Sequence, residues 1–447
     1  MASYTQWKDI RLGDVAKVIS GFAFKSKDFQ PEGIPIIKIK NIRVGAVDLS
    51  EVDHVDSSFL SLDTKYHVKG GDILISLTGS HLTQPNSVVG RVALHSSSLG
   101  HCLLNQRAGK IIVTKPEICN KLFLFYSIYA EEKRRKIALM ALGAASQANV
   151  SPSQVESVEI KLPPLPTQRK LAAIISAYDD LIENNTRRIE ILEEMARSLY
   201  REWFVNFRFP GHEQVKMIDS TSEFGLIPEG WEVLPIDELI KRGILEKNQD
   251  GNHGEKHPKS TNYVPVGIPF IMAKDLANNI LNLANCQLIS NEQAQSLRVG
   301  FAKKGDVLLT HKATMGRVAI VPQVENFIVL TPQVTYFRIK NSSSLNQAFL
   351  YCTFTSDRFQ DILSGQSEQS TRKFISITNQ RNIKILYPSP DWINKFGKII
   401  NDVLNLKQSL YSKNVNLRQT RDLLLPQLIS GEIDVENIDI NTGEIAA

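Results

Sequence analysis

The stretch Gly33-Ile34-Pro35-Ile36-Ile37-Lys38-Ile39-Lys40-Asn41-Ile42 occurs a second time, in altered form, as Gly267-Ile268-Pro269-Phe270-Ile271-Met272-Ala273-Lys274-Asp275-Leu276. Three further pairs follow in the same order: 69–76 with 303–310, 90–93 with 316–319, and 150–151 with 375–376. Because the separation drifts only from 234 to 225 residues, the matches indicate a duplicated domain. Two similar domains in one chain can contact a target at two points.

Each repeat contains short apolar runs bounded by Gly, Pro, Asn and Ser, which is typical of β-strands. The predicted strands are 34–39, 72–77 and 110–113 in the first repeat, and 268–272, 307–310 and 334–339 in the second. A helix is predicted over 120–141 and another over 344–363, from apolar residues at helical spacing. We expect each repeat to form an α+β or mostly-β domain of about 160 residues.

Proline-rich segments end both repeats, at 163–166 and 388–390, and a long heptad pattern follows each. The patterns extend over more than about 30 residues, which favours two helices that pack together as a coiled coil. The alternative is that each helix packs on its own domain. Asn185 falls in the pattern, where a polar residue fixes register, although it could also face solvent. The predicted interface residues are Leu171, Tyr178, Leu181, Leu192, Leu199, Phe396, Val403, Leu406, Leu410, Leu417 and Leu424.

The predicted fold class is therefore α+β, with two repeated domains separated by a long antiparallel coiled-coil helix pair. A helix of 35 residues is roughly 50 Å long, more than one turn of DNA at about 34 Å, which suggests a ruler. The expected organisation is the first domain over 1–165, a central helix over 166–207, a linker over 208–229, the second domain over 230–390, a C-terminal helix over 391–430 and an acidic tail over 431–447. We expect the tail to be mobile, with docking as the alternative.

The composition is that of a soluble protein with sizeable cores: 447 residues, 42% hydrophobic, with a formal net charge of +5. The basic balance permits nucleic acid as a partner without requiring it. Four widely spaced cysteines are expected to be buried free thiols in a reducing cytoplasm. We find neither the apolar core of a signal peptide nor an apolar run long enough to span a bilayer, so a cytoplasmic protein is expected.

The sequence lacks the motifs of common catalytic sites: a phosphate loop, a dinucleotide fingerprint, a nucleophile elbow and the Asn/Asp-Pro-Pro string of amino-methyltransferases. His253 and His257 have the spacing of zinc ligands on a helix, but Gly254 and Pro258 favour a polar loop, and no metal site is predicted. Glu159-Ile160-Lys161 resembles a nuclease motif but lies in an alternating strand. These features favour recognition over catalysis.

Polar and basic side chains lie in loops beside the repeated strands. Arg and Lys suit guanine edges and phosphates, and Asn and Gln suit adenine, although solvated loop surface is the simpler interpretation for any single lysine. The candidate DNA-binding residues of the first repeat are Lys25, Lys27, Lys40, Asn41, Ser80, His81, Arg91, Gln106, Arg107, Gln147 and Asn149. Those of the second are His253, Lys256, His257, Lys259, Lys274, His311, Lys312, Thr314, Arg317, Gln333, Gln369, Thr371, Arg372 and Lys373.

A further set of motifs comprises Gly21-Phe22-Ala23-Phe24-Lys25-Ser26, the duplicated Gly-Ile-Pro, Gly-Asp-Ile/Val-Leu and Gly-Arg-Val-Ala segments, the junction 162–168 and the helix end 424–431. Through these motifs the chain resembles, over essentially its whole length, the specificity subunits of type I restriction-modification enzymes. The second junction, 387–391, departs from the Pro-Pro-Leu-Pro-x-Gln form of the first, and 365–375 is three residues longer than its counterpart, so the second domain follows the family less closely.

The resemblance implies a non-catalytic subunit with two target recognition domains, each reading one half of a bipartite site in double-stranded DNA. It implies that the conserved helices set the gap and dock two modification (methyltransferase) subunits, and that restriction (translocase and nuclease) subunits join the complex. It implies no cofactor in this chain, with S-adenosylmethionine, ATP and Mg on the partners. The alternatives are a scaffold or adaptor protein, or a nuclease or methyltransferase with an unrecognised active site.

Overall fold

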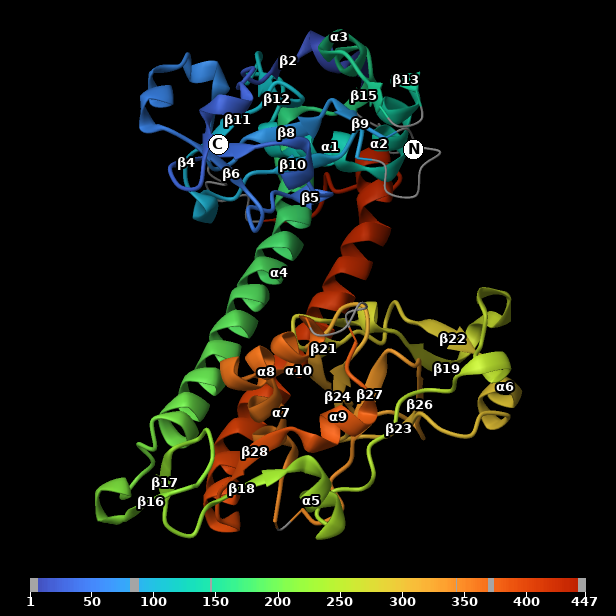
Figure 1. The fold of residues 1–447 in the computed structure, drawn as a ribbon. Helices are drawn as coiled ribbons and strands as arrows, with labels where there is room; N and C mark the ends of the chain where they lie inside the picture. Colours follow the sequence, from blue (N-terminus) through green and yellow to red (C-terminus); the bar gives the residue numbers. More distant parts are fainter. Residues whose placement is uncertain (1–6, 81–87, 145–146, 343, 369–373, 441–447) are drawn as a thin grey trace. The chain divides into compact units, whose positions relative to one another are not determined.

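The computed structural model describes residues 7–80, 88–144, 147–342, 344–368 and 374–440. The chain divides into two compact units (Figure 1). Unit 1 comprises residues 1–182 and 416–447, and unit 2 comprises residues 183–415. Each unit holds one sequence repeat together with part of both long helices. The predicted fold class, two repeated mixed domains with a long helix between them in the chain, is confirmed.

Unit 1 is built around two five-stranded sheets, β2-β12-β8-β10-β5 and β3-β6-β4-β11-β7. A three-stranded sheet, β13-β14-β9, and the antiparallel pair β1-β15 complete it. The strands are β1 (Lys8–Arg11), β2 (Ala16–Ser20), β3 (Phe29–Gln30), β4 (Ile34–Ile37), β5 (Gly45–Ala46), β6 (Asp53–Val55), β7 (His67–Val68), β8 (Ile73–Ser76), β9 (Thr78–Gly79), β10 (Val92–Leu94), β11 (Cys102–Leu104), β12 (Ala108–Val113), β13 (Leu142–Ala144), β14 (Gln147–Asn149) and β15 (Glu159–Leu162). The shorter helices are α1 (Lys121–Tyr129), α2 (Glu131–Leu139) and α3 (Pro152–Glu156).

Unit 2 repeats the central part of this topology. The antiparallel set β25-β24-β27 corresponds to β10-β8-β12, and the parallel pair β19-β26 corresponds to β4-β11. The strands are β16 (Met217–Asp219), β17 (Leu226–Pro228), β18 (Glu232–Pro235), β19 (Tyr263–Ile271), β20 (Leu276–Ala277), β21 (Ile280–Leu281), β22 (Gln287–Ile289), β23 (Phe301–Ala302), β24 (Val307–Thr310), β25 (Val318–Ile320), β26 (Ile328–Leu330), β27 (Val334–Phe337) and β28 (Lys384–Tyr387). The shorter helices are α5 (Ile236–Lys241), α6 (Asn291–Gln295), α7 (Gln347–Thr355), α8 (Asp357–Glu368) and α9 (Ile377–Asn382).

The single helix predicted in each repeat is two helices in the structure. The chain between α1 and α2 is extended at Ala130 (φ −53°, ψ 136°), and the chain between α7 and α8 is extended at Ser356 (φ −69°, ψ 147°). One extended residue interrupts the helical hydrogen bonds and turns the following helix. The prediction of one continuous helix was wrong because the apolar spacing continues across the break.

The two long helices are α4 (Leu165–Tyr200) and α10 (Pro390–Ser430). In unit 1, Leu171 and Ile175 of α4 lie in the same buried cluster as Leu425 and Leu428 of α10. The carboxylate of Asp179 forms an ion pair with Arg421. Rising numbers along α4 meet falling numbers along α10, so the two helices pack antiparallel within this unit.

The same helices pack antiparallel within unit 2. The side-chain amide of Asn185 donates to the amide oxygen of Asn414 at 2.9 Å. Ile189 lies in a buried cluster with Leu410, and Glu193 forms an ion pair with Lys407. We call the residues at these contacts the helix seam. Asn185 is therefore a buried seam residue, 8% exposed, and the alternative of solvent exposure is excluded.

Two residues predicted at the helix interface lie outside it. Leu181 is 51% exposed and Leu406 is 41% exposed, whereas the neighbouring residues Ile182 and Lys407 are buried. The buried residues of α4 include Leu171, Ile175, Ile182, Asn185 and Ile189. The second buried position of each heptad therefore comes one residue later than predicted. In α10, the corresponding position is occupied by a lysine, which an apolar pattern does not reveal.

The segment 208–229, predicted as an exposed linker, contains structure. Phe209 is 1% exposed and Ile227 is 2% exposed, and β16 pairs with β17 as a hairpin. Both residues belong to the main buried cluster of unit 2. The described part of the acidic tail, 431–440, also packs: Val435 is 2% exposed, and the ammonium of Lys170 donates to the carbonyl oxygens of Glu436 and Ile438 at 2.8 and 2.9 Å.

The thiols of Cys102, Cys119 and Cys352 are buried and that of Cys286 is half-buried, and all four are unpaired. Burial raises the pKa of Cys102 to about 11 and that of Cys119 to about 12, so both stay protonated near neutral pH. Of the helices in the described ranges, none has the length and apolar character needed to cross a bilayer.

Candidate nucleic-acid interface

Three chain segments of unit 1 meet where β8 ends. The backbone N–H of Leu77 donates to the carbonyl of Arg107 at 3.0 Å, and the carbonyl of Leu77 accepts from the N–H of Val150 at 2.9 Å. Beside them β14 pairs with β9, with Asn149 opposite Thr78. We call the segments 77–80, 105–107 and 147–150 the unit 1 junction.

Unit 2 repeats this arrangement at the end of β24. The N–H of His311 donates to the carbonyl of Gln333 at 3.0 Å, and the carbonyl of His311 accepts from the N–H of Ile375 at 3.0 Å. The preceding residue also corresponds, because the hydroxyl oxygens of Ser76 and Thr310 accept from the backbone N–H groups of Arg91 and Arg317. We call the segments 311–314, 331–333 and 374–375 the unit 2 junction.

The side chains that the two junctions present are different. The unit 1 junction exposes Gln106, Arg107 and Asn149, and the hydroxyl of Thr78 donates to the amide oxygen of Asn149 at 2.7 Å. This bond orients the amide and leaves its NH₂ group as a donor. The unit 2 junction exposes Lys312 and Thr314. Exposed guanidinium, ammonium and amide groups are the chemistry that contacts phosphates and base edges.

An acidic residue that the sequence prediction missed lies beside the unit 2 junction. The carboxylate of Asp250, 9% exposed, contacts Nε2 of His253 at 2.8 Å and lies 3.8 Å from Nε2 of His311. His311 is itself 2% exposed and donates from Nδ1 to the carbonyl of Ile375 at 2.9 Å. Burial lowers the pKa of His311. The equivalent residue of the first repeat is Leu77, which does not titrate. Aligning the two repeats would therefore have shown that an ionisable residue replaces an apolar one at this position.

Some candidate residues are used by the fold. Asn41 is 2% exposed, and its amide donates to the carbonyls of Asp48 and Glu51 at 2.9 and 3.3 Å. The guanidinium of Arg317 donates to the carbonyls of Ala273 and Leu276 at 3.2 and 3.0 Å. Gln333 accepts from the N–H of Ala273 at 3.4 Å. These side chains hold loops in place, so most of their hydrogen-bonding groups are not available to contact a DNA base.

Other candidate residues are exposed or half-buried and make none of the side-chain hydrogen bonds described for the two junctions. Lys40 forms an ion pair with Asp53 at 3.1 Å, whereas Lys274 is exposed at the equivalent position of the second repeat. The exposed residues of this set are Lys25, Lys27, Lys256 and Lys259; Ser80, Arg91 and His257 are half-buried. Burial lowers the pKa of Arg91.

The remaining candidates lie outside the described residues: His81, Gln369, Thr371, Arg372 and Lys373, with Gln147 described only in its backbone. His253 and His257 flank a short 3-10 turn, Gly254–Lys256, and a helical zinc motif is not formed there. In the described ranges no three His, Cys, Asp or Glu side chains converge in a way that could hold a metal ion.

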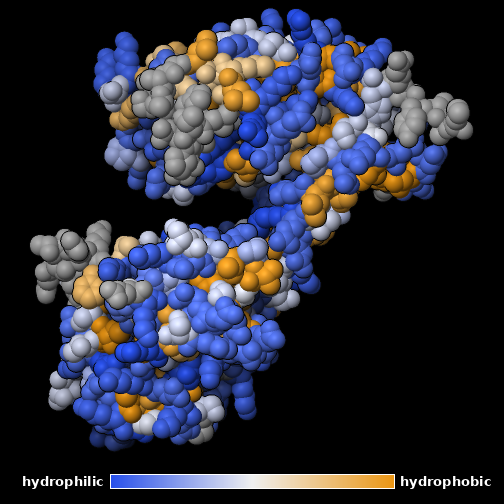
Figure 2. Space-filling view, turned by 90° about the vertical axis from the view of Figure 1, so that its right-hand side faces the viewer, coloured by the Kyte–Doolittle hydropathy of each residue, from blue (hydrophilic) through white to orange (hydrophobic). Residues whose placement is uncertain are grey.

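The face shown in Figure 2 is predominantly hydrophilic, with hydrophobic patches between the hydrophilic areas. Fold and surface together define a class: a protein with a duplicated domain that presents unlike polar side chains on like scaffolds, with a pair of long helices. The two junctions share the same pattern of backbone hydrogen bonds, but they expose different side chains.

The comparisons with known proteins agree with this class. The family model described as "Type I restriction modification DNA specificity domain" matches residues 4–194 and again 228–413. The type I restriction enzyme MjaIX specificity subunit of Methanocaldococcus jannaschii is 25% identical, over 97% of this chain and 94% of the relative. The type I restriction enzyme EcoBI specificity subunit of Escherichia coli is 22% identical, over 100% of this chain and 91% of the relative.

Among solved structures, the crystal structure of the type I restriction-modification system S subunit from M. genitalium superposes with a TM-score of 0.59. It covers 96% of this chain and 97% of that chain at 16% sequence identity, which shows a shared fold. The chain belongs to the type I restriction-modification DNA specificity family, and its class is that of a specificity subunit.

Proposed function

We propose that each unit reads one half of a bipartite DNA site, and that this chain is the non-catalytic specificity subunit of its complex. The observation that supports the proposal is the pair of junctions. Leu77 and His311 make the same backbone bonds, while Arg107 and Gln333 occupy equivalent places with different chemistry. Equal scaffolds with unequal side chains are what two readers of different sequences need.

The exposed cations supply the sequence-independent part of binding. Lysines such as Lys312, Lys256 and Lys27 contact phosphates, which gives affinity that falls steeply with salt. Amide and guanidinium groups at the junctions supply the discrimination between bases, because bidentate contacts to base edges are worth about 1–3 kcal/mol each. Asn149 and Arg107 are the strongest candidates for this second role in unit 1.

The helix pair sets the length of the gap between the two half-sites. Neither α4 nor α10 is interrupted over its length, 36 residues in α4 and 41 in α10. Polar seam contacts such as Asn185–Asn414 fix the register in which two such helices pair. Because the register and the length of the helix pair are both fixed, only one gap length between the two half-sites is permitted.

The helices also dock two modification subunits. Both carry apolar side chains that face away from the seam: Ile191 and Met195 on α4 are 59% and 54% exposed, and Ile399 and Leu406 on α10 are 48% and 41% exposed. Exposed apolar side chains grouped on a helix are typical of a protein interface. Methyl transfer with S-adenosylmethionine, and ATP- and Mg-dependent translocation and cleavage by restriction subunits, belong to the partners.

The experiment is an exchange of residues 1–160 for the same segment of a related specificity subunit, followed by mapping of methylated adenines in the host genome. The proposal expects a change in one half-site, with the other half-site and the gap unchanged. A change in both half-sites, or in neither, would contradict independent readers. Cleavage or methyl transfer by the purified chain alone would favour the enzyme alternative, and complexes without sequence-dependent DNA binding would favour the scaffold.

A further inference from the structure

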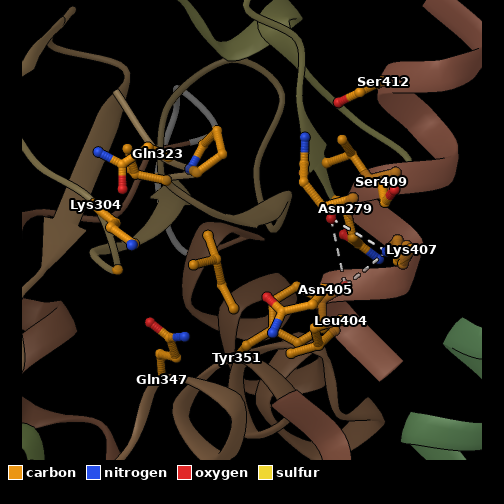
Figure 3. A pocket seen from close by; sticks show the side chains of 16 residues that line it. Asn279, Lys304, Gln323, Gln347, Tyr351, Leu404, Asn405, Lys407, Ser409 and Ser412 are labelled. Atoms are coloured by element: carbon orange, nitrogen blue, oxygen red, sulfur yellow. Dashed lines mark hydrogen bonds between the residues drawn. The ribbon is translucent and has the colours of Figure 1, made fainter. Parts of the chain in front are cut away.

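A cavity of about 390 Å³ lies within unit 2, between α10 and the edge of the domain (Figure 3). Leu404, Asn405 and Gln408 of α10 form one wall, and residues 320–323, at and after the end of β25, form the other. Gln347 and Tyr351 of α7 close the base. This volume lies in the range of pockets that hold a ligand or a large side chain, about 300–1,000 Å³.

The lining combines apolar walls with a polar rim that carries no carboxylate. Ile280, Ile320 and Pro322 are apolar, and the polar groups that face the cavity are amides, hydroxyls and two lysines. The side chain of Lys304 reaches toward the cavity from its rim in Figure 3. Among the described residues, Lys304 forms no ion pair, so its charge is left for a ligand.

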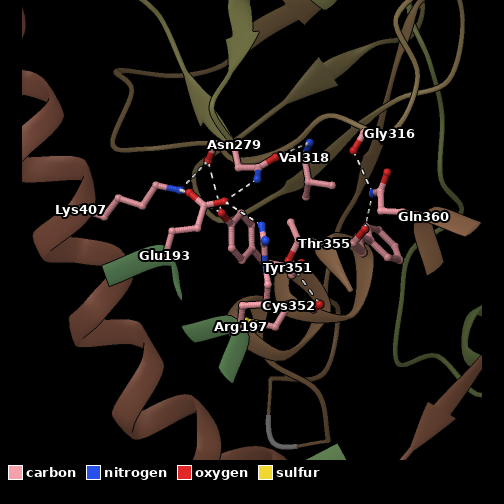
Figure 4. A network of polar contacts seen from close by, with 11 residues as sticks. Glu193, Arg197, Asn279, Gly316, Val318, Tyr351, Cys352, Thr355, Gln360 and Lys407 are labelled. Carbon is pink, nitrogen blue, oxygen red and sulfur yellow. Dashed lines mark hydrogen bonds and ion pairs between the residues drawn. The ribbon is translucent and has the colours of Figure 1, made fainter. Parts of the chain in front are cut away.

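The second lysine, Lys407, is already engaged (Figure 4). It is 2% exposed, pairs with Glu193 and donates to the hydroxyl of Tyr351 at 3.0 Å. It also donates to the carbonyl of Asn279 at 3.3 Å, and the amide of Asn279 in turn donates to Glu193. These bonds tie α4, α7, α10 and the β20–β21 turn together, so the cavity is preformed.

A glycine with a left-handed backbone conformation lies at the rim beside Lys304. Gly305 has φ +86°, and a Cβ there would lie 2.9 Å from the side-chain oxygen of Gln347. The positive φ favours glycine here, whereas the amide of Gln347 is the end of a flexible side chain that can move aside. Gly305 thereby sets the entrance of the cavity beside the ammonium group.

We propose that this cavity is a socket for a polypeptide segment of a modification subunit, in which an apolar side chain enters the walls and a neighbouring carboxylate pairs with Lys304. The inference rests on the proposed function, because it names a contact of the same complex. It is favoured by position: Asn405 and Ser409 line the cavity on the stretch of α10 that also exposes Leu406. A partner lying along α10 would pass the entrance.

The test uses the full chain with its modification subunits and a matched pair of charge reversals. Lys304→Glu faces the cavity, whereas Lys303→Glu makes the same change one residue away, on an exposed side chain that does not line it. We expect K304E to weaken assembly by about ten-fold or more, the loss of one charge-assisted contact, and K303E to stay within about two-fold. Equal affinities for the two variants would overturn the socket.

A second measurement does not depend on a charge change. A photo-crosslinking residue at Gln323, on the wall opposite α10, is expected to join this chain to a modification subunit in the assembled complex. Crosslinks only to DNA or to another subunit, or no crosslink, would contradict the proposal. If the unmodified chain does not bind modification subunits, the proposed function itself is wrong. If it binds them, but K304E and K303E bind equally and Gln323 gives no crosslink to a modification subunit, only the socket is wrong.

Discussion

The amide of Asn185 on α4 donates a hydrogen bond to the amide oxygen of Asn414 on α10, at 2.9 Å, and both side chains are buried. Asn414 also donates to the hydroxyl of Thr186 at 3.2 Å. A buried amide pair between two helices favours the one register in which the two amides meet. The same layer therefore bears on stability and, in the proposed function, on the spacing between the two half-sites.

Replacing one member of this pair should cost more than replacing both. In Asn185→Leu, Asn414 loses a donor inside the seam, and we expect a loss of about 1–3 kcal/mol in the free energy of unfolding of unit 2. The double variant N185L/N414L should recover most of that loss. Urea unfolding of the two single variants and the double variant, as a double-mutant cycle, measures the coupling. Additive losses would show that the amides do not interact.

Breaking the Lys407–Glu193 ion pair should reduce the free energy of unfolding more than breaking the Asn185–Asn414 pair. Lys407→Met leaves the partly buried carboxylate of Glu193 without its ammonium partner, and breaking such a pair costs about 3–5 kcal/mol. Lys395 forms an exposed ion pair with Asp391 on the same helix, so Lys395→Met is the matched control and should cost less than about 1 kcal/mol. Thermal unfolding checks both. A similar small loss for the two variants would mean that solvent reaches the Lys407 site.

The lowered pKa of His311 predicts that the free energy of unfolding of unit 2 depends on pH. Burial lowers its pKa in the folded chain, so between that pKa and about 6.5 the unfolded chain binds more protons. The free energy of unfolding of unit 2 should therefore rise as the pH rises through this window. The nearby charge of Asp250 raises the pKa of His311, and those of Lys312 and His253 lower it.

The control is His311→Leu, which introduces the residue found at the equivalent position of unit 1. We expect this variant to lose the pH dependence of unfolding in the window below about pH 6.5 while staying folded at pH 7.5. Denaturant unfolding at a series of pH values checks it. If wild type and variant show the same slope, another group is responsible.

Variants of Arg317 and Lys312 test whether the first residue is structural and the second binds DNA, as the proposed function requires. The guanidinium of Arg317 holds two backbone carbonyls, so Arg317→Ala should destabilise unit 2 by about 1–3 kcal/mol. Lys312→Ala should change stability by less than about 0.5 kcal/mol and reduce the salt slope of DNA binding by about one. Unfolding and salt-dependent DNA titrations of the assembled complex check the pair. The reverse pattern would contradict the assignment.

The duplication and the helix pair could be predicted because ordered repeats and long heptads depend on patterns that survive in sequence. The seam was misplaced at Leu181 because leucine is apolar on either face, and Lys407 was missed because its partners lie far apart in the chain. Asn41 and Arg317 looked like DNA-binding residues, since nothing local shows that carbonyls of Asp48 and Ala273 use them. The burial of Phe209 likewise depends on tertiary packing that a turn-rich segment does not predict.

The most direct test inserts one heptad into α4 after Arg188 and one into α10 after Tyr411, the facing position of the antiparallel pair. Seven residues lengthen a helix by about 10.5 Å, which corresponds to about three base pairs. Mapping of methylated adenines should then return both half-sites unchanged, with a gap about three base pairs longer. An unchanged gap in an active complex would contradict the claim that the helix pair sets the distance between the two readers.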